Sequence, residues 1–164
     1  MPIHNSFHHA TPPGGSVQAF PDGLRIIGPV LAVQIEIPTA LATQLQKDNQ
    51  KIPSPVLGQA LIDTGASVSA VDATVVGQLG VQPVGIKNVG TAGGPQQQAT
   101  YPAKFSFPGT KLPSIEFNEL LGANLAGQQL PLPQGQIIAL LGRDILQLFI
   151  LVYNGPGGMY SVAF

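Results

Sequence analysis

The 164-residue chain has no cysteine and no tryptophan, and it carries few charged side chains. The lack of cysteine excludes disulfide bonds, thiolate catalysis and zinc sites built on thiolates. Its 7 Lys and Arg and 8 Asp and Glu residues make 9% of the chain, whereas about 25% is usual for a globular domain. Since the formal net charge is −1 and no basic cluster stands out, we expect no nucleic-acid partner and no anionic membrane partner.

Long hydrophobic runs are also missing. A membrane-spanning helix needs about 20 consecutive apolar residues, and the best stretches, 26–33 and 145–153, are too short or interrupted. The first residues, Met1 to Asn5, lack the basic and apolar regions of a signal peptide. We therefore expect a cytoplasmic protein with no membrane partner.

The chain is rich in glycine and proline, with 20 and 16 residues, yet 44% of its residues are hydrophobic. No short repeat explains the Gly and Pro content, so a packed core remains possible, and the length suits one domain. Residues 1–23 have little periodic apolar pattern and are expected to form a flexible N-terminal arm. Residues 24–164 are expected to form the domain, with an insert at 38–58.

Short apolar runs separated by turn residues predict a mostly β fold. Strands are expected at 30–37, 59–62, 84–89, 99–107, 137–141, 149–153 and 159–164. Short helices are expected at 39–46, with Thr39 as cap, after a capping Asp72, and just after Gly142. Residues 108–136 are Pro- and Gly-rich with short apolar patches. This spacing of strands is typical of an all-β sandwich or barrel.

One of the eight acidic residues stands apart from the others. Asp63 directly follows the apolar run Ala60-Leu61-Ile62 and precedes the small residues Thr64-Gly65-Ala66-Ser67. A strand that leaves the core would therefore deliver a carboxylate to its end, where small residues let backbone amides approach. The same pattern is consistent with a turn in which the acid bonds its own backbone.

The segment around Asp63 resembles the active-site loop of retropepsin-like aspartic proteases. There, two apolar residues precede Asp-Thr/Ser-Gly-Ala, as Leu61-Ile62 precede Asp63-Thr64-Gly65-Ala66 here. Leu140-Leu141-Gly142-Arg143-Asp144 looks like the second signature of the family, apolar-apolar-Gly-Arg-Asp/Asn followed by a short helix. The Gly-rich hairpin at 84–107 lies between the two motifs, where these enzymes carry the flap. The resemblance covers about residues 24–164, and the last hairpin resembles small bacterial members.

The resemblance implies a closed-barrel-like retropepsin fold with a flap hairpin and one short C-terminal helix, in a homodimer. It implies an aspartic endopeptidase that cleaves extended polypeptide segments and needs no cofactor or metal. Two carboxylates a few ångströms apart can activate water and protonate the leaving amine, because like-charge repulsion keeps one of them protonated. The chain has a single Asp-Thr-Gly, so the second carboxylate is expected from the Asp63 of another copy, related by a twofold axis.

The resemblance also assigns roles residue by residue. Asp63 is the expected acid and base, and Thr64 is expected to form a hydrogen bond across the dimer axis. Gly65 is expected to offer its carbonyl oxygen as an acceptor to the substrate backbone. Substrate contacts are also expected from Ala66, Ser67, Thr91, Ala92, Gly93 and Gly94. Gly142, Arg143 and Asp144 are expected to support the catalytic loop from beneath.

Two features keep other interpretations open. Ser67 stands where retroviral members commonly have Asp, so the usual acidic partner of Arg143 is missing, and Asp144 is the candidate substitute. A catalytically idle dimerisation or peptide-binding domain on the same scaffold is the alternative function. The intact Asp63-Thr64-Gly65 favours the enzyme, because an idle scaffold has no need for two like charges that face each other.

Weaker signals point to other sites. His4 and His8 have the spacing of a helical metal pair, but a solvated tail is the simpler interpretation for them. Ser67 and Ser69 have no histidine nearby in an ordered region, which argues against a serine triad. The run 89–94 lacks the Gly-Lys-Ser/Thr ending of a phosphate loop, so a flap tip is preferred there.

Overall fold

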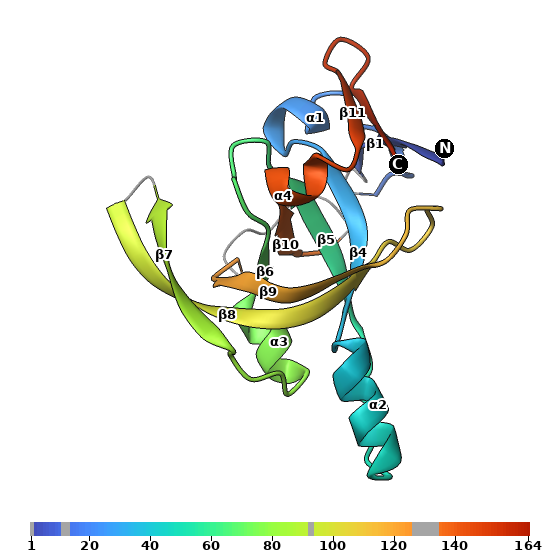
Figure 1. Cartoon of the computed structure of the whole chain (residues 1–164). Helices are drawn as coiled ribbons and strands as arrows, with labels where there is room; N and C mark the ends of the chain where they lie inside the picture. The colour runs from blue at the N-terminus through green and yellow to red at the C-terminus, as the bar shows by residue number, and fades with distance from the viewer. Residues whose placement is uncertain (1, 11–13, 92–93, 126–134) are drawn as a thin grey trace.

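Six strands form a closed barrel. The computed structural model of the chain describes residues 2–10, 14–91, 94–125 and 135–164. Round the barrel the strands run in the order β4, β5, β10, β6, β9 and β8, and β8 pairs back with β4 (Figure 1). Their bounds are β4 Val30–Glu36, β5 Val56–Ile62, β6 Ala70–Asp72, β8 Gly94–Ser106, β9 Ile115–Ala123 and β10 Ile137–Leu141. A seventh strand, β7 Gly85–Thr91, pairs with β8 at the edge of this sheet. The expected mostly β, barrel-like fold is confirmed at this level.

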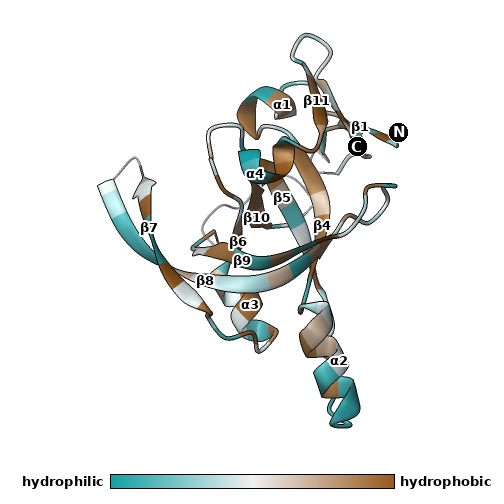
Figure 2. Cartoon of the chain, viewed as in Figure 1, coloured by the Kyte–Doolittle hydropathy of each residue, from teal (hydrophilic) through white to brown (hydrophobic). Residues whose placement is uncertain are grey.

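Alternating apolar side chains fill the barrel. β4 buries Leu31, Val33 and Ile35, whereas Ala32 between them is exposed, as in a strand with one face toward a core. β10 is buried along nearly its whole length because β5 and β6 flank it on both sides. Figure 2 shows the result, with apolar residues concentrated on β4 and β10 and hydrophilic residues at the far ends of α2 and β8.

β9 lies within the segment 108–136, in which the sequence showed only short apolar patches. It pairs in parallel with β6 and antiparallel with β8, and it buries Leu120 and Leu121. The polar residues Glu116, Asn118 and Glu119 break a simple apolar pattern in this segment. It forms a strand nevertheless, because it pairs with segments that are distant in the sequence. Residues 126–134 of the same segment lie outside the described residues.

In the part of the chain that the structure describes, four short helices accompany the barrel: α1 Gly23–Ile26, α2 Thr39–Lys47, α3 Ala73–Gln78 and α4 Arg143–Leu146. Asp72 caps α3 as expected, since its carboxylate accepts hydrogen bonds from the amides of Thr74 and Val75 at 2.8 and 3.2 Å. Among the described residues, no helix combines the length and the apolar character needed to cross a membrane.

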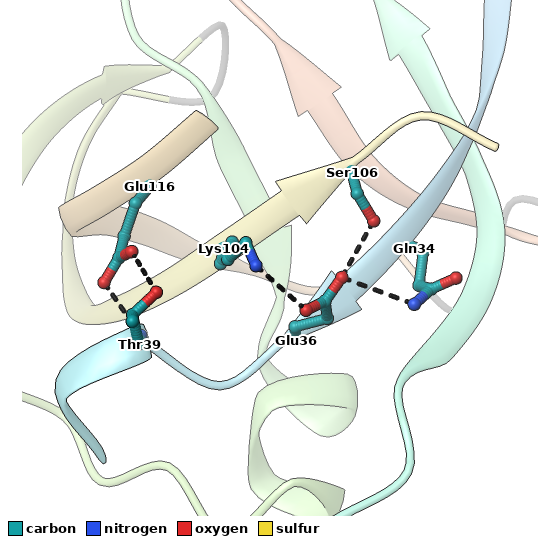
Figure 3. A network of polar contacts seen from close by, with 6 residues as sticks. All are labelled: Gln34, Glu36, Thr39, Lys104, Ser106 and Glu116. Atoms are coloured by element: carbon teal, nitrogen blue, oxygen red, sulfur yellow. Dashed lines mark hydrogen bonds and ion pairs between the residues drawn. The ribbon is translucent and has the colours of Figure 1, made fainter. Parts of the chain in front are cut away.

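The expected cap of α2 is wrong. Pro38 occupies the cap position, and Thr39 is already helical. Glu116 of β9 supplies the missing acceptor, because its carboxylate receives the Thr39 amide at 2.9 Å and the Thr39 hydroxyl at 2.6 Å (Figure 3). These hydrogen bonds lower the pKa of Glu116. A residue remote in sequence thus caps this helix, which a local pattern cannot reveal.

Beside this cap, Glu36 of β4 connects the two strands that close the barrel. Its carboxylate accepts hydrogen bonds from Ser106 at 2.8 Å and from Gln34 at 3.3 Å, and it pairs with Lys104 at 3.3 Å (Figure 3). Lys104 and Ser106 both belong to β8, so the network reinforces the β4–β8 pairing.

The N-terminal residues differ from the expected flexible arm. Strand β1, Ile3–Phe7, pairs with β12, Met159–Ala163, and β12 pairs with β11, Ile150–Asn154, to form a second sheet. Strands β2, His9–Ala10, and β3, Gln18–Ala19, form a short ladder. His8 is 1% exposed, and its Nε2 lies 2.8 Å from the Gly28 carbonyl oxygen. The segment escaped prediction because β1 leaves Ile3 and Phe7 exposed, so its apolar residues do not mark the buried face.

Candidate active site

Asp63 lies at the end of β5, in a loop that leaves the barrel wall and enters β6. Its amide donates a hydrogen bond to the Leu141 carbonyl of β10 at 3.0 Å, which continues the β5–β10 pairing by one residue. Asp63 is half-buried, whereas Thr64 and Gly65 are exposed. The carboxylate thus sits where the core meets the surface.

The sequence is also consistent with a turn in which the Asp63 carboxylate bonds the backbone of its own loop, and one of its two oxygens does so. Oδ1 accepts hydrogen bonds from the amides of Gly65 at 2.9 Å and Ala66 at 3.2 Å. Oδ2 accepts none within the part of the chain that the structure describes. The loop therefore fixes the orientation of the carboxylate through Oδ1 and leaves Oδ2 available to a water, a ligand or another carboxyl group.

Gly142 lies directly against this loop, and only glycine fits there. A Cβ on Gly142 would lie 2.5 Å from the carbonyl carbon of Val68, 2.6 Å from its oxygen and 3.0 Å from the Ser69 nitrogen. The Gly142 amide donates to the Ser69 hydroxyl at 2.9 Å. The next amide, that of Arg143, donates to the Ala66 carbonyl at 3.0 Å. The two predicted motifs, at 60–71 and 137–146, thus meet in space.

Arg143 ties the exposed part of the loop. Its Nη1 donates to the carbonyl oxygens of Thr64 at 3.1 Å and Gly65 at 3.3 Å. The Gly65 carbonyl, for which the resemblance implied a bond to substrate, therefore already has one donor within the chain. The Thr64 side chain has no hydrogen-bond partner in the described segments.

Asp144 does not replace the missing partner of Arg143. Its carboxylate accepts hydrogen bonds from the Ser69 amide at 2.9 Å, the Ser69 hydroxyl at 2.7 Å and the Ile145 amide at 2.9 Å. No ion pair joins Asp144 to Arg143 in the residues that the structure covers. The suggestion is wrong because the start of α4 points the Asp144 carboxylate at Ser69.

Ser69 is the supporting residue that the sequence did not reveal. It is 1% exposed, donates to Asp144 and accepts from the Gly142 amide, so it joins the loop to α4. A small polar residue two positions after Ser67 gives no sequence signal of this role. Ser67 itself is exposed on the same loop, as expected for a residue that contacts a ligand.

The expected flap is a long hairpin. β7 and β8 pair from Gly85↔Thr100 to Thr91↔Gly94, and the hairpin extends away from the barrel (Figure 1). Gly94 has φ +102°, a left-handed conformation that favours glycine next to the turn. Ala92 and Gly93, expected at the tip, lie outside the described residues.

Three cavities among the described residues lie away from Asp63. A groove of about 450 Å³ runs between the start of α2, the residues after α3 and the outer side of β9. Two smaller cavities, of about 190 and 180 Å³, adjoin α2 and α3, and residues 63–69 line none of the three.

No cluster of three or more His, Cys, Asp or Glu side chains that could hold a metal ion occurs in residues 2–10, 14–91, 94–125 and 135–164. No protein-family model and no curated protein matches the chain. The family resemblance therefore stays a prediction from the two motifs and the hairpin between them.

Proposed function

We propose that the protein is an aspartic endopeptidase that acts as a homodimer, with one Asp63 from each copy in a shared site. The proposal rests chiefly on the geometry of Asp63. The turn holds Oδ1 at 2.9 and 3.2 Å from two amides, while Oδ2 has no partner among the described residues. Asp63 is half-buried beside the exposed Thr64 and Gly65, which supports a site that a second copy completes.

The chemistry needs a proton acceptor and a proton donor at one place. Two facing carboxylates share one proton because both cannot ionise at short distance. The ionised carboxylate takes a proton from water as the water attacks the peptide carbonyl, and the protonated one gives its proton to the leaving amine. Because the reaction uses one ionised and one protonated carboxyl group, a bell-shaped pH profile of cleavage is expected.

Residues beneath the loop support this role. Gly142, Arg143 and Asp144 contribute hydrogen bonds that fix the backbone from Thr64 to Ser69. A carboxylate in a rigid loop loses less freedom when it reaches the productive geometry. The hairpin β7–β8 offers backbone groups with which an extended peptide can pair and a lid that excludes water.

A peptide-library digestion with wild type and Asp63→Asn tests the proposal. We expect wild type to cleave and the variant, with an unchanged dimer, to be inactive. Equal cleavage by both proteins would overturn the enzymatic assignment. Binding of peptides by both, with cleavage by neither, would establish the idle peptide-binding domain instead.

Mixing the two proteins tests the shared site. After subunit exchange at equal amounts, only about one quarter of the dimers carry two Asp63 residues. Activity per total protein should therefore fall to about a quarter of that of wild type alone. A fall to only about one half would mean that each copy works by itself, which contradicts the shared site.

A further inference from the structure

The hairpin β7–β8 projects beyond the barrel. The pairing of β8 with β9 reaches Thr100↔Leu121, and the pairing of β7 with β8 continues from Gly85↔Thr100 to Thr91↔Gly94. Residues 86–91 and 94–99 therefore form a two-stranded arm beyond the last β8–β9 pair (Figure 1). Isolated two-stranded hairpins are marginally stable, so contacts at the base set the orientation of this arm.

One carboxylate joins three strands at that base. Glu119 of β9 receives Lys87 Nζ of β7 at 2.6 Å on Oε2 and the Thr100 hydroxyl of β8 at 2.9 Å on Oε1. Thr100 is 0% exposed, so its hydroxyl holds the carboxylate from the buried side. These two donors lower the pKa of Glu119, so its carboxyl stays ionised to more acidic pH.

Gly85 makes room for this arrangement. A Cβ at Gly85 would lie 3.0 Å from Glu119 Oε1 and 3.0 Å from the Thr100 hydroxyl oxygen. The carboxylate therefore lies over the backbone of β7 at the first residue of the hairpin, where a side chain would crowd it. Four side chains or positions thus fit together at this point: Gly85, Thr100, Lys87 and Glu119. An ion pair formed by chance at the surface would not require a glycine and a buried hydroxyl group beside it.

The ion pair lies near the base of the hairpin, so a small change there moves the far end of β7. Lys87 is four residues before Thr91, so Thr91 lies about 13 Å farther along the strand at about 3.3 Å per residue. Lys87 and Glu119 are 51% and 38% exposed at their side chains, so salt can screen the pair. The pair is thus suited to a reversible contact and adds little to global stability.

We propose that Glu119, held by Thr100 and paired with Lys87, is a positioning residue that fixes the orientation of the hairpin relative to the barrel, and that breaking the Lys87–Glu119 pair frees the hairpin and thereby changes how a peptide is held at the Asp63 site. The last part rests on the proposed protease function. The ionic contact itself is a property of the hairpin and can be measured without any substrate.

Hydrogen exchange of the hairpin amides measures the contact directly. Glu119→Gln keeps an acceptor for Thr100 but removes the charge, and Lys87→Met keeps the aliphatic stem. Each should speed exchange in residues 86–91 and 94–99 by about 1.5- to 5-fold, and the double variant should match either single one. Wild type in about 1 M salt should approach the variants, because screening then acts over about 3 Å.

Lys104→Met is the matched control. Lys104 lies on β8, the partner strand of β7, and it also forms a cross-strand ion pair, with Glu36 at 3.3 Å, but at the β4–β8 pairing of the barrel. It should leave exchange in the hairpin unchanged. Unchanged exchange in Lys87→Met and Glu119→Gln, or an equal rise in Lys104→Met, would overturn the proposal.

Peptide cleavage separates a positioning role from a merely structural one. A hairpin that spends less time in the orientation set by the ion pair should raise KM by the same factor of about 1.5 to 5 in Glu119→Gln, with kcat nearly constant. If exchange rises but no protein cleaves, the contact stands and the protease assignment fails. If wild type cleaves but exchange and KM do not change in the variants, the positioning role fails and the protease assignment stands.

Discussion

The addition of one methyl group at Gly142 tests the contact between the two motifs. In Gly142→Ala the new Cβ would lie 2.5 Å from the Val68 carbonyl carbon and 2.6 Å from its oxygen. The φ of Gly142 is −85°, which alanine adopts without strain, so the effect is steric alone. Both neighbours are backbone atoms, which cannot rotate away as a side-chain tip can. The loop from Asp63 to Ser69 must therefore move.

Overpacking of this kind costs about 1–3 kcal/mol. Alanine also reduces the entropy of the unfolded chain, which returns about 0.4–1 kcal/mol. We therefore expect a net loss of about 1–2 kcal/mol in the free energy of unfolding, or a Tm lower by about 2–8 °C. Urea unfolding followed by circular dichroism measures the loss. Peptide cleavage should fall further than the folded fraction does, because the displaced loop carries Asp63.

Gly77→Ala is the matched control, because it adds the same methyl group within α3. Apart from its chain neighbours and the backbone of its own helix, no heavy atom lies within 4 Å of the position its Cβ would take. Alanine should stabilise this helix position by about 0.4–1 kcal/mol, with no effect on cleavage. The two variants should thus shift the unfolding midpoint in opposite directions. A Gly142→Ala protein as stable and as active as wild type would refute the reasoning.

Two further predictions concern residues away from the carboxylate. Asp144→Ala should cost about 1–3 kcal/mol in urea unfolding, because the buried Ser69 amide loses its acceptor, and adding Ser69→Ala should cost less than the sum. Burial lowers the pKa of His8 below its usual value near 6.5, and the Gly28 carbonyl only partly offsets this. The unfolded state then binds the proton more readily, so stability should fall as the pH drops below about 6.5. His8→Gln should show a smaller fall between pH 7 and pH 5; an identical slope would contradict this role for His8.

The sequence was sufficient to locate the loop of Asp63 and its support, because both depend on neighbouring residues. An apolar strand followed at once by Asp63 and small residues predicts a carboxylate at the end of a strand. The same holds for Gly142, which follows the buried strand β10, and for Asp72, whose cap forms with the next residues. Sequence patterns are sufficient to predict such features because the interacting residues are close together in the chain.

The remaining features depend on partners far apart in the chain. β1 is a strand because it pairs with β12, at the other end of the sequence, and it exposes Ile3 and Phe7 against the usual pattern. Glu116 caps α2 across 77 residues. Ser69 meets Asp144 across 75 residues. None of these contacts leaves a periodic signal in the sequence. The two side-chain contacts each depend on a polar residue, Glu116 or Ser69, whose local sequence suggests a loop or a solvated face.

The contacts that hold the Asp63 loop and those that hold the hairpin differ in their exposure to solvent, which divides the molecule into a fixed part and an adjustable part. The loop of Asp63 is held by buried Ser69 and by the close approach of Gly142, so displacing it disturbs the packing of β10 against the loop. The hairpin is held at its base by Glu119 and Lys87, both partly exposed to solvent and salt. The proposed protease function, with a shared pair of carboxylates beneath a hairpin, needs this division. Its carboxylate must keep its orientation from one turnover to the next, whereas its lid must move in each of them.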